Sequence, residues 1–345
     1  MNKKNDYVVH DATPRIGLDV PLDLFGCACA VDVTLRRIHI ATCLFHFGGV
    51  ILAIVFLAMG DDWSIPVVTS FGDWRRRDPT IDGCRDDNCF VTPAHGRLGG
   101  GRISLQGLVV AFHGLSFAWQ FAVLVDECGA RDGIRARYLR QLQNGRNGFR
   151  WTEYALSAPL MTIVIAVIFG IVDFYALLAL AACTSALQFF GYAQEVFLTL
   201  GRKINDPFVV RSPIIAGFVF WIAYWSVIAT AFHQSISASR ATPSPLLTGL
   251  IGGTFGVMTF MYASFAGVLA YDVSRKTSDR NKNYANVEGW YCVLSLLSKW
   301  SLGAFLASIV RVRATVIGLG FVVDAPCAVA TTNVTTLANL TATTL

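Results

Sequence analysis

The chain contains seven apolar stretches, each long enough to cross a lipid bilayer. A bilayer core of about 30 Å needs roughly 20 apolar residues in a helix that rises about 1.5 Å per residue. Only 15% of the 345 residues are charged, whereas soluble domains average about 25%. The sequence therefore predicts an all-α membrane protein built as a seven-transmembrane helix bundle. The expected spans are Ile38–Met59, Ile103–Val125, Phe149–Val172, Phe174–Leu200, Pro213–Phe232, Pro245–Tyr271 and Gly289–Val310.

The basic residues predict the orientation, because cytoplasmic segments of membrane proteins carry an excess of Lys and Arg. With the N-terminus inside, the inner segments hold 18 of these residues and the outer segments hold 9. We therefore expect a cytoplasmic N-terminus and an extracellular or lumenal C-terminus. Residues 1–37 form a cytoplasmic extension, 38–310 the bundle, and 311–345 a Thr-rich extracellular extension. The apolar stretch that starts at Ala314 is too short to span, and we expect it at the interface or packed on the bundle.

The long segment 60–102 is expected to be an extracellular loop after the first span, with short strands around "IPVVTSF" and "CFVTP". Cys84 and Cys89 lie close enough in sequence for a disulfide, although two free thiols are an equally simple reading. Asn333 and Asn339 each start an Asn-x-Thr triplet, the acceptor pattern for glycosylation outside the cytoplasm. The net charge of +5 follows from the inner segments and requires no nucleic-acid partner.

A few ionisable residues interrupt the apolar stretches. Lys299 lies in the middle of the seventh span, where a charge costs about 2.5–3.5 kcal/mol on insertion scales and is a functional candidate. Ser295 is one helical turn earlier on the same face. Glu153 lies near the start of the third span, on a stripe with Ser157 and Met161. A Lys299–Glu153 ion pair is the natural solution, either as a structural bridge or as part of a functional site.

Lys299 also has a chemical alternative, because its amine can condense with an aldehyde to form a Schiff base. A protonated Schiff base still needs a counterion, which is the role that Glu153 would take. Aromatic side chains could enclose an elongated apolar ligand, although such stripes often reflect ordinary helix packing. These aromatic candidates are Phe218, Trp221, Trp225, Phe260, Tyr262 and Phe265.

The remaining buried polar candidates are less specific. Glu195 in the fourth span could be part of a proton path or a charge at a helix end that reaches the inner interface. His46 and His113 occupy the first and second spans, and for each histidine alone a packing role is the simpler reading. Gln188 in the fourth span favours interhelical hydrogen bonding. The cysteines and histidines show no spacing typical of a metal site.

The pattern "RWTEYALS", followed by a lysine near the middle of the seventh span, resembles microbial rhodopsins. Within that superfamily, "NGFRWTEYALSAPLM", "IFGIVDFYALLAL", "FGYAQE" and "VLSLLSKWSL" are most similar to heliorhodopsins, over roughly residues 36–310. The resemblance implies all-trans retinal on Lys299, with Glu153 as counterion and Ser295 and Ser116 as polar neighbours. It also implies an inverted topology and a homodimer. The N-terminal extension, the cysteine-bearing outer loop and the Thr-rich C-terminus lie outside the family core, and with the glycosylation triplets they indicate a eukaryotic or viral source.

In this resemblance His46 matches a first-helix histidine of the family's inner polar cavity. The histidine that accompanies it on the second helix falls at Gln120, which departs from the pattern. A histidine pair as proton acceptor at that place is therefore not expected.

Several functional classes can be compared on these residues. In outward proton pumps a second carboxylate lies four residues before the lysine, and a proton donor lies eleven residues after the third-helix acid. Here these positions hold Ser295 and Val164, which excludes a pump of that design. The two remaining interpretations are a photoreceptor with a slow photocycle, which signals to an unidentified cytoplasmic partner, and a light-gated passive proton channel. The residues give no indication of an enzyme, and transporter repeats are not apparent.

Overall fold

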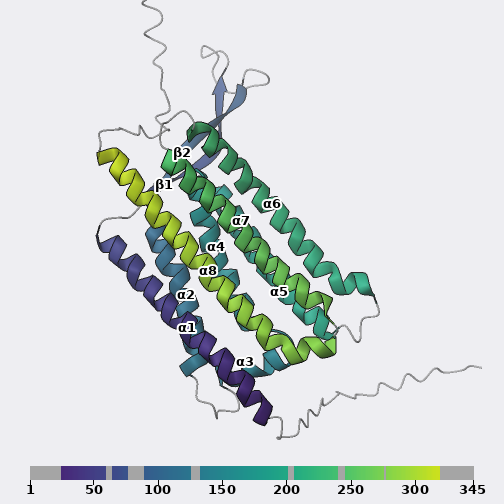
Figure 1. The fold of residues 1–345 in the computed structure, drawn as a ribbon. Helices are drawn as coiled ribbons and strands as arrows, with labels where there is room; N and C mark the ends of the chain where they lie inside the picture. Colours follow the sequence, from purple (N-terminus) through teal and green to yellow (C-terminus); the bar gives the residue numbers. More distant parts are fainter. Residues whose placement is uncertain are drawn as a thin grey trace, which may run out of the picture.

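The computed structural model describes residues 25–59, 64–76, 89–125, 133–200, 206–239, 245–275 and 277–318. Within these ranges seven helices are long and apolar enough to cross a membrane, and they pack side by side as one bundle (Figure 1). The seven are α1 (Phe25–Ala58), α2 (Leu105–Val125), α4 (Gly148–Ile168), α5 (Phe174–Leu200), α6 (Pro207–Ser239), α7 (Pro245–Ser274) and α8 (Thr277–Gly318). The expectation of a multi-pass protein with seven spans is confirmed.

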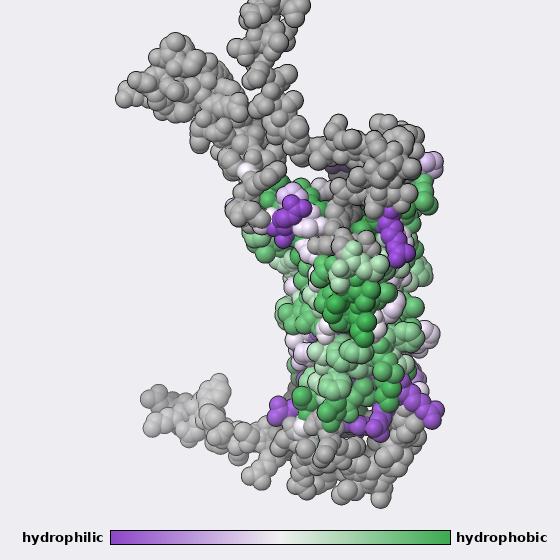
Figure 2. All heavy atoms as spheres, turned by 90° about the vertical axis from the view of Figure 1, so that its left-hand side faces the viewer, coloured by the Kyte–Doolittle hydropathy of each residue, from purple (hydrophilic) through white to green (hydrophobic). Residues whose placement is uncertain are grey.

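The surface of the bundle has the polarity that a bilayer requires. Figure 2 shows a hydrophobic band around the middle of the described helices, with hydrophilic residues gathered at both ends. Large apolar side chains such as Leu44, Phe189 and Phe260 are more than half exposed in the isolated chain. This apolar surface would be covered by lipid tails, because few soluble monomers expose such an area.

Two smaller elements mark the ends of the bundle. Strands β1 (Ser64–Arg76) and β2 (Cys89–Ser104) pair antiparallel, with a register shift between Pro66 and Val68. This hairpin extends from one end of the bundle, and α3 (Ile134–Gln143) lies at the opposite end (Figure 1). We call them the hairpin end and the α3 end. Helix α3 is a short amphipathic helix that the search for apolar spans did not predict.

Helix α4 is the centre of the bundle. In its membrane-length window 72% of the residues are buried, compared with 17–33% in the other six spans. It contacts α2, α5, α6 and α8, and its apolar residues from Met161 to Ile168 form the middle of the main core cluster. A polar side chain on the buried faces of α4 is therefore shielded from lipid.

The ends of several helices differ from the predicted spans. Helix α4 ends at Ile168, before the predicted Val172, because Gly170 adopts a left-handed conformation with φ 89°. Its N–H and that of Ile171 donate to carbonyls of the last turn, which is a common glycine stop signal. Helix α2 begins at Leu105 rather than Ile103, since β2 continues to Ser104.

The two outer helices are longer than predicted. Helix α1 begins at Phe25, within the segment expected to be an extension. Helix α8 continues to Gly318, so the first residues of the apolar stretch after Ala314 extend the last helix instead of forming a separate segment. Cys84, Asn333 and Asn339 lie outside the described residues. The predictions of a disulfide and of glycosylation therefore also lie outside them.

Candidate functional site

The Lys299 side chain is buried in the middle of the bundle and makes three polar contacts. Its Nζ donates to Ser116 Oγ at 2.6 Å, to Glu153 Oε1 at 2.8 Å and to Ser295 Oγ at 3.0 Å. Only 2% of Lys299 and 7% of Glu153 is exposed. An ammonium group has three N–H donors, so these contacts satisfy it fully without water.

Three helices assemble this group. Helix α8 supplies Lys299 and, one turn earlier on the same face, Ser295. Helix α4 supplies Glu153, and α2 supplies Ser116, whose hydroxyl contacts the same Glu153 oxygen at 2.6 Å. The ion pair predicted from the sequence is therefore present, and Ser116 completes it.

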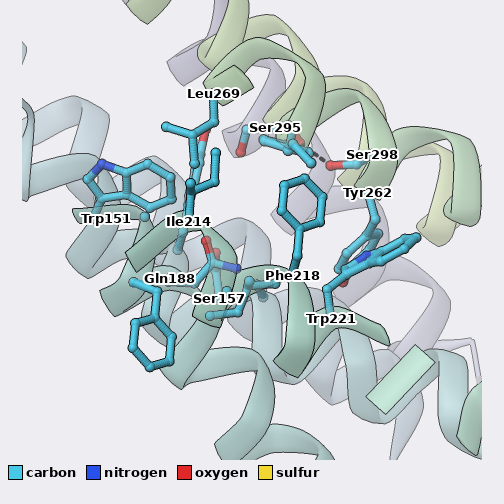
Figure 3. Close-up of a pocket in the computed structure, with 18 of the residues that line it drawn as sticks. Trp151, Ser157, Gln188, Ile214, Phe218, Trp221, Tyr262, Leu269, Ser295 and Ser298 are labelled. Atoms are coloured by element: carbon cyan, nitrogen blue, oxygen red, sulfur yellow. Dashed lines mark hydrogen bonds between the residues drawn. The ribbon is translucent and has the colours of Figure 1, made fainter. Parts of the chain in front are cut away.

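A pocket opens beside the Lys299 Nζ and has about 860 Å³ of space between its lining atoms, including the part at its mouth. Figure 3 shows the aromatic rings of Trp151, Phe218, Trp221 and Tyr262 directed toward this space, with Ser295 and Ser298 on the α8 side. The predicted residues Ser157, Met161, Trp221 and Phe265 all line the pocket, whereas Phe260 is exposed on the outer surface of α7.

The walls of the pocket are held in place by ring contacts. Trp221 and Trp225 stack with an interplanar angle of 9°, and Trp225 contacts Tyr262 at 5.2 Å between ring centroids. On the α4 side Trp151 packs against Tyr154 and Tyr291. Aromatic rings lose little conformational freedom on packing because they have two side-chain torsions. The pocket is therefore a rigid apolar slot that ends at an amine.

A second buried charge group lies closer to the α3 end. Arg150 forms ion pairs with Glu195 and Glu288, and its guanidinium lies 3.9 Å from the centre of the Tyr291 ring. Tyr284 contributes a hydroxyl that donates to Glu195 at 2.6 Å. One arginine thus neutralises part of the charge of two carboxylates, and the hydroxyl stabilises the rest.

A polar cavity of about 30 Å³ lies between this group and the Lys299 group. Glu153 and Ser295 line it on one side, and Arg150 and Glu288 line it on the other. His39 also lines it, and one nitrogen of its ring lies 2.8 Å from the Tyr138 hydroxyl. Outside the predicted spans, burial raises the pKa of Tyr138 well above its ordinary value, with a further contribution from Glu288. The Tyr138 hydroxyl is therefore protonated at neutral pH.

The structure separates two residues that the sequence comparison placed together. Gln120 contacts His39, at 3.0 Å from Nδ1, and not His46. His46 lies two turns farther along α1, where its Nδ1 is 3.1 Å from Nδ1 of His113. His46 does not line the cavity that His39 and Gln120 line, and its place in a proton path stays a prediction. Both His39 and His46 lie on the buried face of α1, and the spacing of seven residues did not show which one faces Gln120.

Three residues that line the polar cavity at the α3 end were not predicted as site residues from the sequence. Glu288 lies just before the predicted seventh span and was not among the candidates. His39 was not considered, and Arg150 was noted as an inner basic residue one turn before Glu153, without a partner among the acidic residues. Glu195, predicted as a member of a proton path, forms its ion pair with Arg150 instead of contacting Glu153 directly. The signal that could have found Glu288 is the helical register of Glu288, Cys292, Ser295 and Lys299, which share one face.

The chemistry of the described residues allows one alternative ligand. One ligand atom each of His39, Glu288 and Cys292 lies within 4.8 Å of the others, a spacing that a metal ion would accept. The Glu288 carboxylate is already paired with Arg150. The group is therefore electrostatically satisfied without an ion.

The arrangement of the helices is found in solved structures of light-absorbing proteins. The chain superposes on thermophilic rhodopsin with a TM-score of 0.53 and 13% identity, covering 83% of this chain and 97% of that one. It also superposes on the transmembrane domain of the Salpingoeca rosetta rhodopsin phosphodiesterase, with a TM-score of 0.52 and 12% identity over 84% and 89% of the two chains. At such identities these matches show the fold alone. The phosphodiesterase activity named for that protein does not transfer to this chain.

Fold and site together define a seven-helix membrane protein of the rhodopsin class. The family model described as Heliorhodopsin matches residues 35–308, and the chain therefore belongs to the heliorhodopsin family. A comparison with curated proteins gives no match. Membership implies a retinal chromophore and the general role of a retinal-binding photoreceptor, in agreement with the expectation from "RWTEYALS" and Lys299.

The pocket fits this chromophore. It is apolar and aromatic-walled, as a polyene chain requires, and the only amine among its lining residues is Lys299. Within the described chain, the buried hydroxyl of Ser157 and the indole N–H of Trp221 have no hydrogen-bond partner. Both residues line the pocket.

Proposed function

We propose that this chain is a heliorhodopsin-type light sensor that holds all-trans retinal on Lys299, with Glu153 as the counterion. Retinal, when bound, absorbs visible light and isomerises. The observation that supports this assignment is the Lys299 group itself, a buried amine at the end of an apolar slot with a carboxylate at 2.8 Å. An unreacted lysine at this depth would be costly, and a Schiff base would connect the amine to the ligand.

Glu153 is the acceptor best suited to the charge that remains on Nζ. A Schiff-base nitrogen has one N–H in place of the three that the free ammonium group donates. Of the three acceptors now in contact, only Glu153 carries a negative charge, and hydrogen bonds to charged groups are stronger than those to hydroxyls. Ser116, which donates to Glu153, would keep the carboxylate ionised and oriented. Ser295 would be left as a polar neighbour.

The Arg150 group supports a sensor rather than a pump. The carboxylates nearest to Glu153 on the α3 side, Glu195 and Glu288, are both fixed by Arg150, so neither is a free proton acceptor. Val164, at the position where outward pumps have a proton donor, is fully buried in the core. A slow photocycle without active transport follows if the proton leaves and returns to Nζ inside the bundle.

One observation favours a second candidate, a light-gated passive proton path. Buried protonatable side chains lie on both sides of Lys299: the polar cavity at the α3 end, and His46 with His113 toward the hairpin end. Light-evoked current in a voltage-clamped cell separates the two candidates. Current that reverses with the proton gradient indicates a channel, whereas no current under bright light indicates a sensor.

We further propose the inverted topology for this protein, with the N-terminus and the α3 end cytoplasmic and the hairpin end extracellular. The excess of Lys and Arg in the segments on the α3 side supports it. The basic segments 126–150 and 274–288 would then face a cytoplasmic signalling partner. A homodimer within the bilayer remains a proposal from the family resemblance.

The first test is a visible absorption spectrum of the full chain with all-trans retinal, beside Lys299→Ala. A band in the wild type and none in the variant is the expected result. A folded wild type that gives no band, or a variant that keeps the band, would reject the assignment.

A further inference from the structure

Two arginines from different helices line one hollow at the α3 end of the bundle. Arg36 on α1 and Arg135 on α3 line it together with His39, Tyr138 and apolar side chains of α1, α2 and α3. Arg36 and His39 are three residues apart on α1 and therefore share a face, and the same spacing holds on α3. One ring nitrogen of His39 lies 2.8 Å from the Tyr138 hydroxyl, which holds the two faces together. We call this feature the α3 hollow.

The α3 hollow lies where the apolar spans end. On α2 it is lined by Val123 and Leu124, in the last turn of that helix. On α1 it is lined by Arg36, near the beginning of the apolar span Thr34–Ala58. Figure 2 shows hydrophilic residues gathered at both ends of the hydrophobic band. A group bound in the hollow is therefore at the boundary between hydrocarbon and water, where lipid headgroups lie.

The charge at the α3 hollow is positive. Its lining in the described part of the chain includes two guanidinium groups and no carboxylate. Arg36 is exposed and makes no ion pair with another described residue. Only 7% of Arg135 is exposed, and it also interacts with another group, but a guanidinium has five N–H donors and can serve two partners. Such groups favour phosphate and carboxylate oxygens as ligands.

The start of α3 adds backbone donors to the same place. Gly133 is the N-cap of α3 and has no side chain that could accept from the first N–H groups of the helix. Arg135 is the second residue of α3, so the hollow lies beside this N-terminus. Free N–H groups and the helix dipole both favour an anion there, and phosphate is a common one.

The size and the remaining lining indicate what kind of anion fits. The hollow has about 10 Å³ of space, roughly what one water-sized group needs, so most of a ligand must lie outside it. The half-buried side chains of Leu124 and Leu139 line it as well. An acyl chain in the bilayer can cover such apolar side chains, whereas a free ion leaves them in contact with water.

We propose that the α3 hollow binds the phosphate group of an anionic phospholipid, with phosphate oxygens at Arg36 and Arg135 and the acyl chains in the bilayer beside Leu124. A zwitterionic lipid fits less well, because its cationic headgroup would face the same two guanidinium groups. This site is additional to the proposed light sensor and does not depend on retinal.

A bound lipid would lie next to the polar cavity. His39 and Tyr138 line both the α3 hollow and the cavity that Glu153 borders. A phosphate in the hollow would therefore restrict two side chains that both spaces share.

The test measures lipid binding to the full chain in detergent, without retinal, by native mass spectrometry. The wild type is titrated with phosphatidylglycerol and, separately, with phosphatidylcholine, and the first phosphatidylglycerol should bind more tightly. Arg36→Gln should weaken this first step about tenfold, because it removes a charge-assisted hydrogen bond. Arg135→Gln should act in the same direction, with a thermal melt to show that this buried variant is folded.

Two matched variants remove the same charge outside the hollow. Arg37 and Arg137 are exposed neighbours on the same two helices and do not line it. Arg37→Gln and Arg137→Gln should therefore bind phosphatidylglycerol as the wild type does.

Three results would overturn the proposal. Phosphatidylcholine that binds as tightly as phosphatidylglycerol would show that the hollow does not select an anionic lipid. A loss in Arg37→Gln or Arg137→Gln equal to that in Arg36→Gln would show only a general attraction to basic residues. Displacement of the lipid by excess inorganic phosphate or by a soluble polyglutamate peptide would assign the hollow to a soluble anion. Because no retinal is present, a failure of the proposed light-sensing function leaves these results unchanged.

Discussion

Gly191 on α5 gives the sharpest prediction about the pocket. A Cβ at this position would overlap the Cη2 and Cζ3 atoms of the Trp151 ring and lie 2.9 Å from its Cε3. The ring cannot simply retreat, because the Arg150 guanidinium is 5.0 Å from its centroid and Tyr291 packs against it with a centroid distance of 5.8 Å. In Gly191→Ala the indole must therefore move into the pocket or push α5 outward.

The expected cost can be isolated with a matched variant. Overpacking a core site costs about 1–3 kcal/mol, whereas Gly→Ala within a helix gains up to about 1 kcal/mol. Gly256→Ala on α7 makes the same helical exchange, but nothing lies within 4 Å of the new Cβ. The difference between the two variants is thus the overpacking term, about 1–3 kcal/mol.

The assay is thermal unfolding of both variants, together with the visible spectrum after addition of retinal. At about 2–4 °C per kcal/mol, Gly191→Ala should melt roughly 2–12 °C below Gly256→Ala, with a shifted or weakened band. Equal melting temperatures and identical spectra would show that Trp151 does not form a rigid wall of the pocket, and the argument for a preformed slot would fail.

Three further predictions address the charges. Glu153→Gln removes the carboxylate at 2.8 Å from Nζ, so the visible band should move and should be lost at a lower pH than in the wild type; a pH titration with an unchanged midpoint would contradict the counterion role. Arg150→Gln leaves two buried carboxylates unpaired and should destabilise the bundle by about 3–5 kcal/mol in thermal unfolding, whereas additional replacement of Glu195 and Glu288 by Gln should restore part of the loss. Asp173 is the N-cap of α5. Burial raises the pKa of its carboxyl group, but hydrogen bonds from the N–H groups of Ala176 and Ser70 outweigh that effect, so the pKa lies below the ordinary value of 3.8. The ionised Asp173 therefore stabilises the fold above the ordinary pKa, and this stabilisation is lost as the pH falls through the lowered pKa. Asp173→Ala should reduce the free energy of unfolding by about 0.5–2 kcal/mol as a lost cap, and it should abolish this pH dependence of the melting temperature.

Much of the fold could be predicted from the sequence because membrane spans are set by local composition. A continuous run of apolar residues identifies a span without knowledge of its neighbours, and all seven were found in this way. The helix ends were less accurate, since α4 stops before a left-handed glycine and α8 continues past the predicted end at Val310. These limits depend on backbone geometry and on packing at the bundle ends rather than on hydropathy.

The Lys299–Glu153 pair could be predicted from the sequence for the same reason. Each is a charge in an apolar helix, and such charges require a partner; few candidates were available, and the third-helix motif resembled a known counterion pattern. The sequence thereby determined the membrane class, the seven spans, the lysine and its carboxylate.

Which other polar groups meet was decided only by the tertiary structure. Helical register places a residue on a face, but the rotation and depth of each helix in the bundle determine which faces are opposed. Thus Gln120 contacts His39, His46 contacts His113, and Glu195 is neutralised by Arg150. These pairings depend on contacts across more than 40 residues of sequence, and they arise because the packing of the helices places these side chains opposite one another.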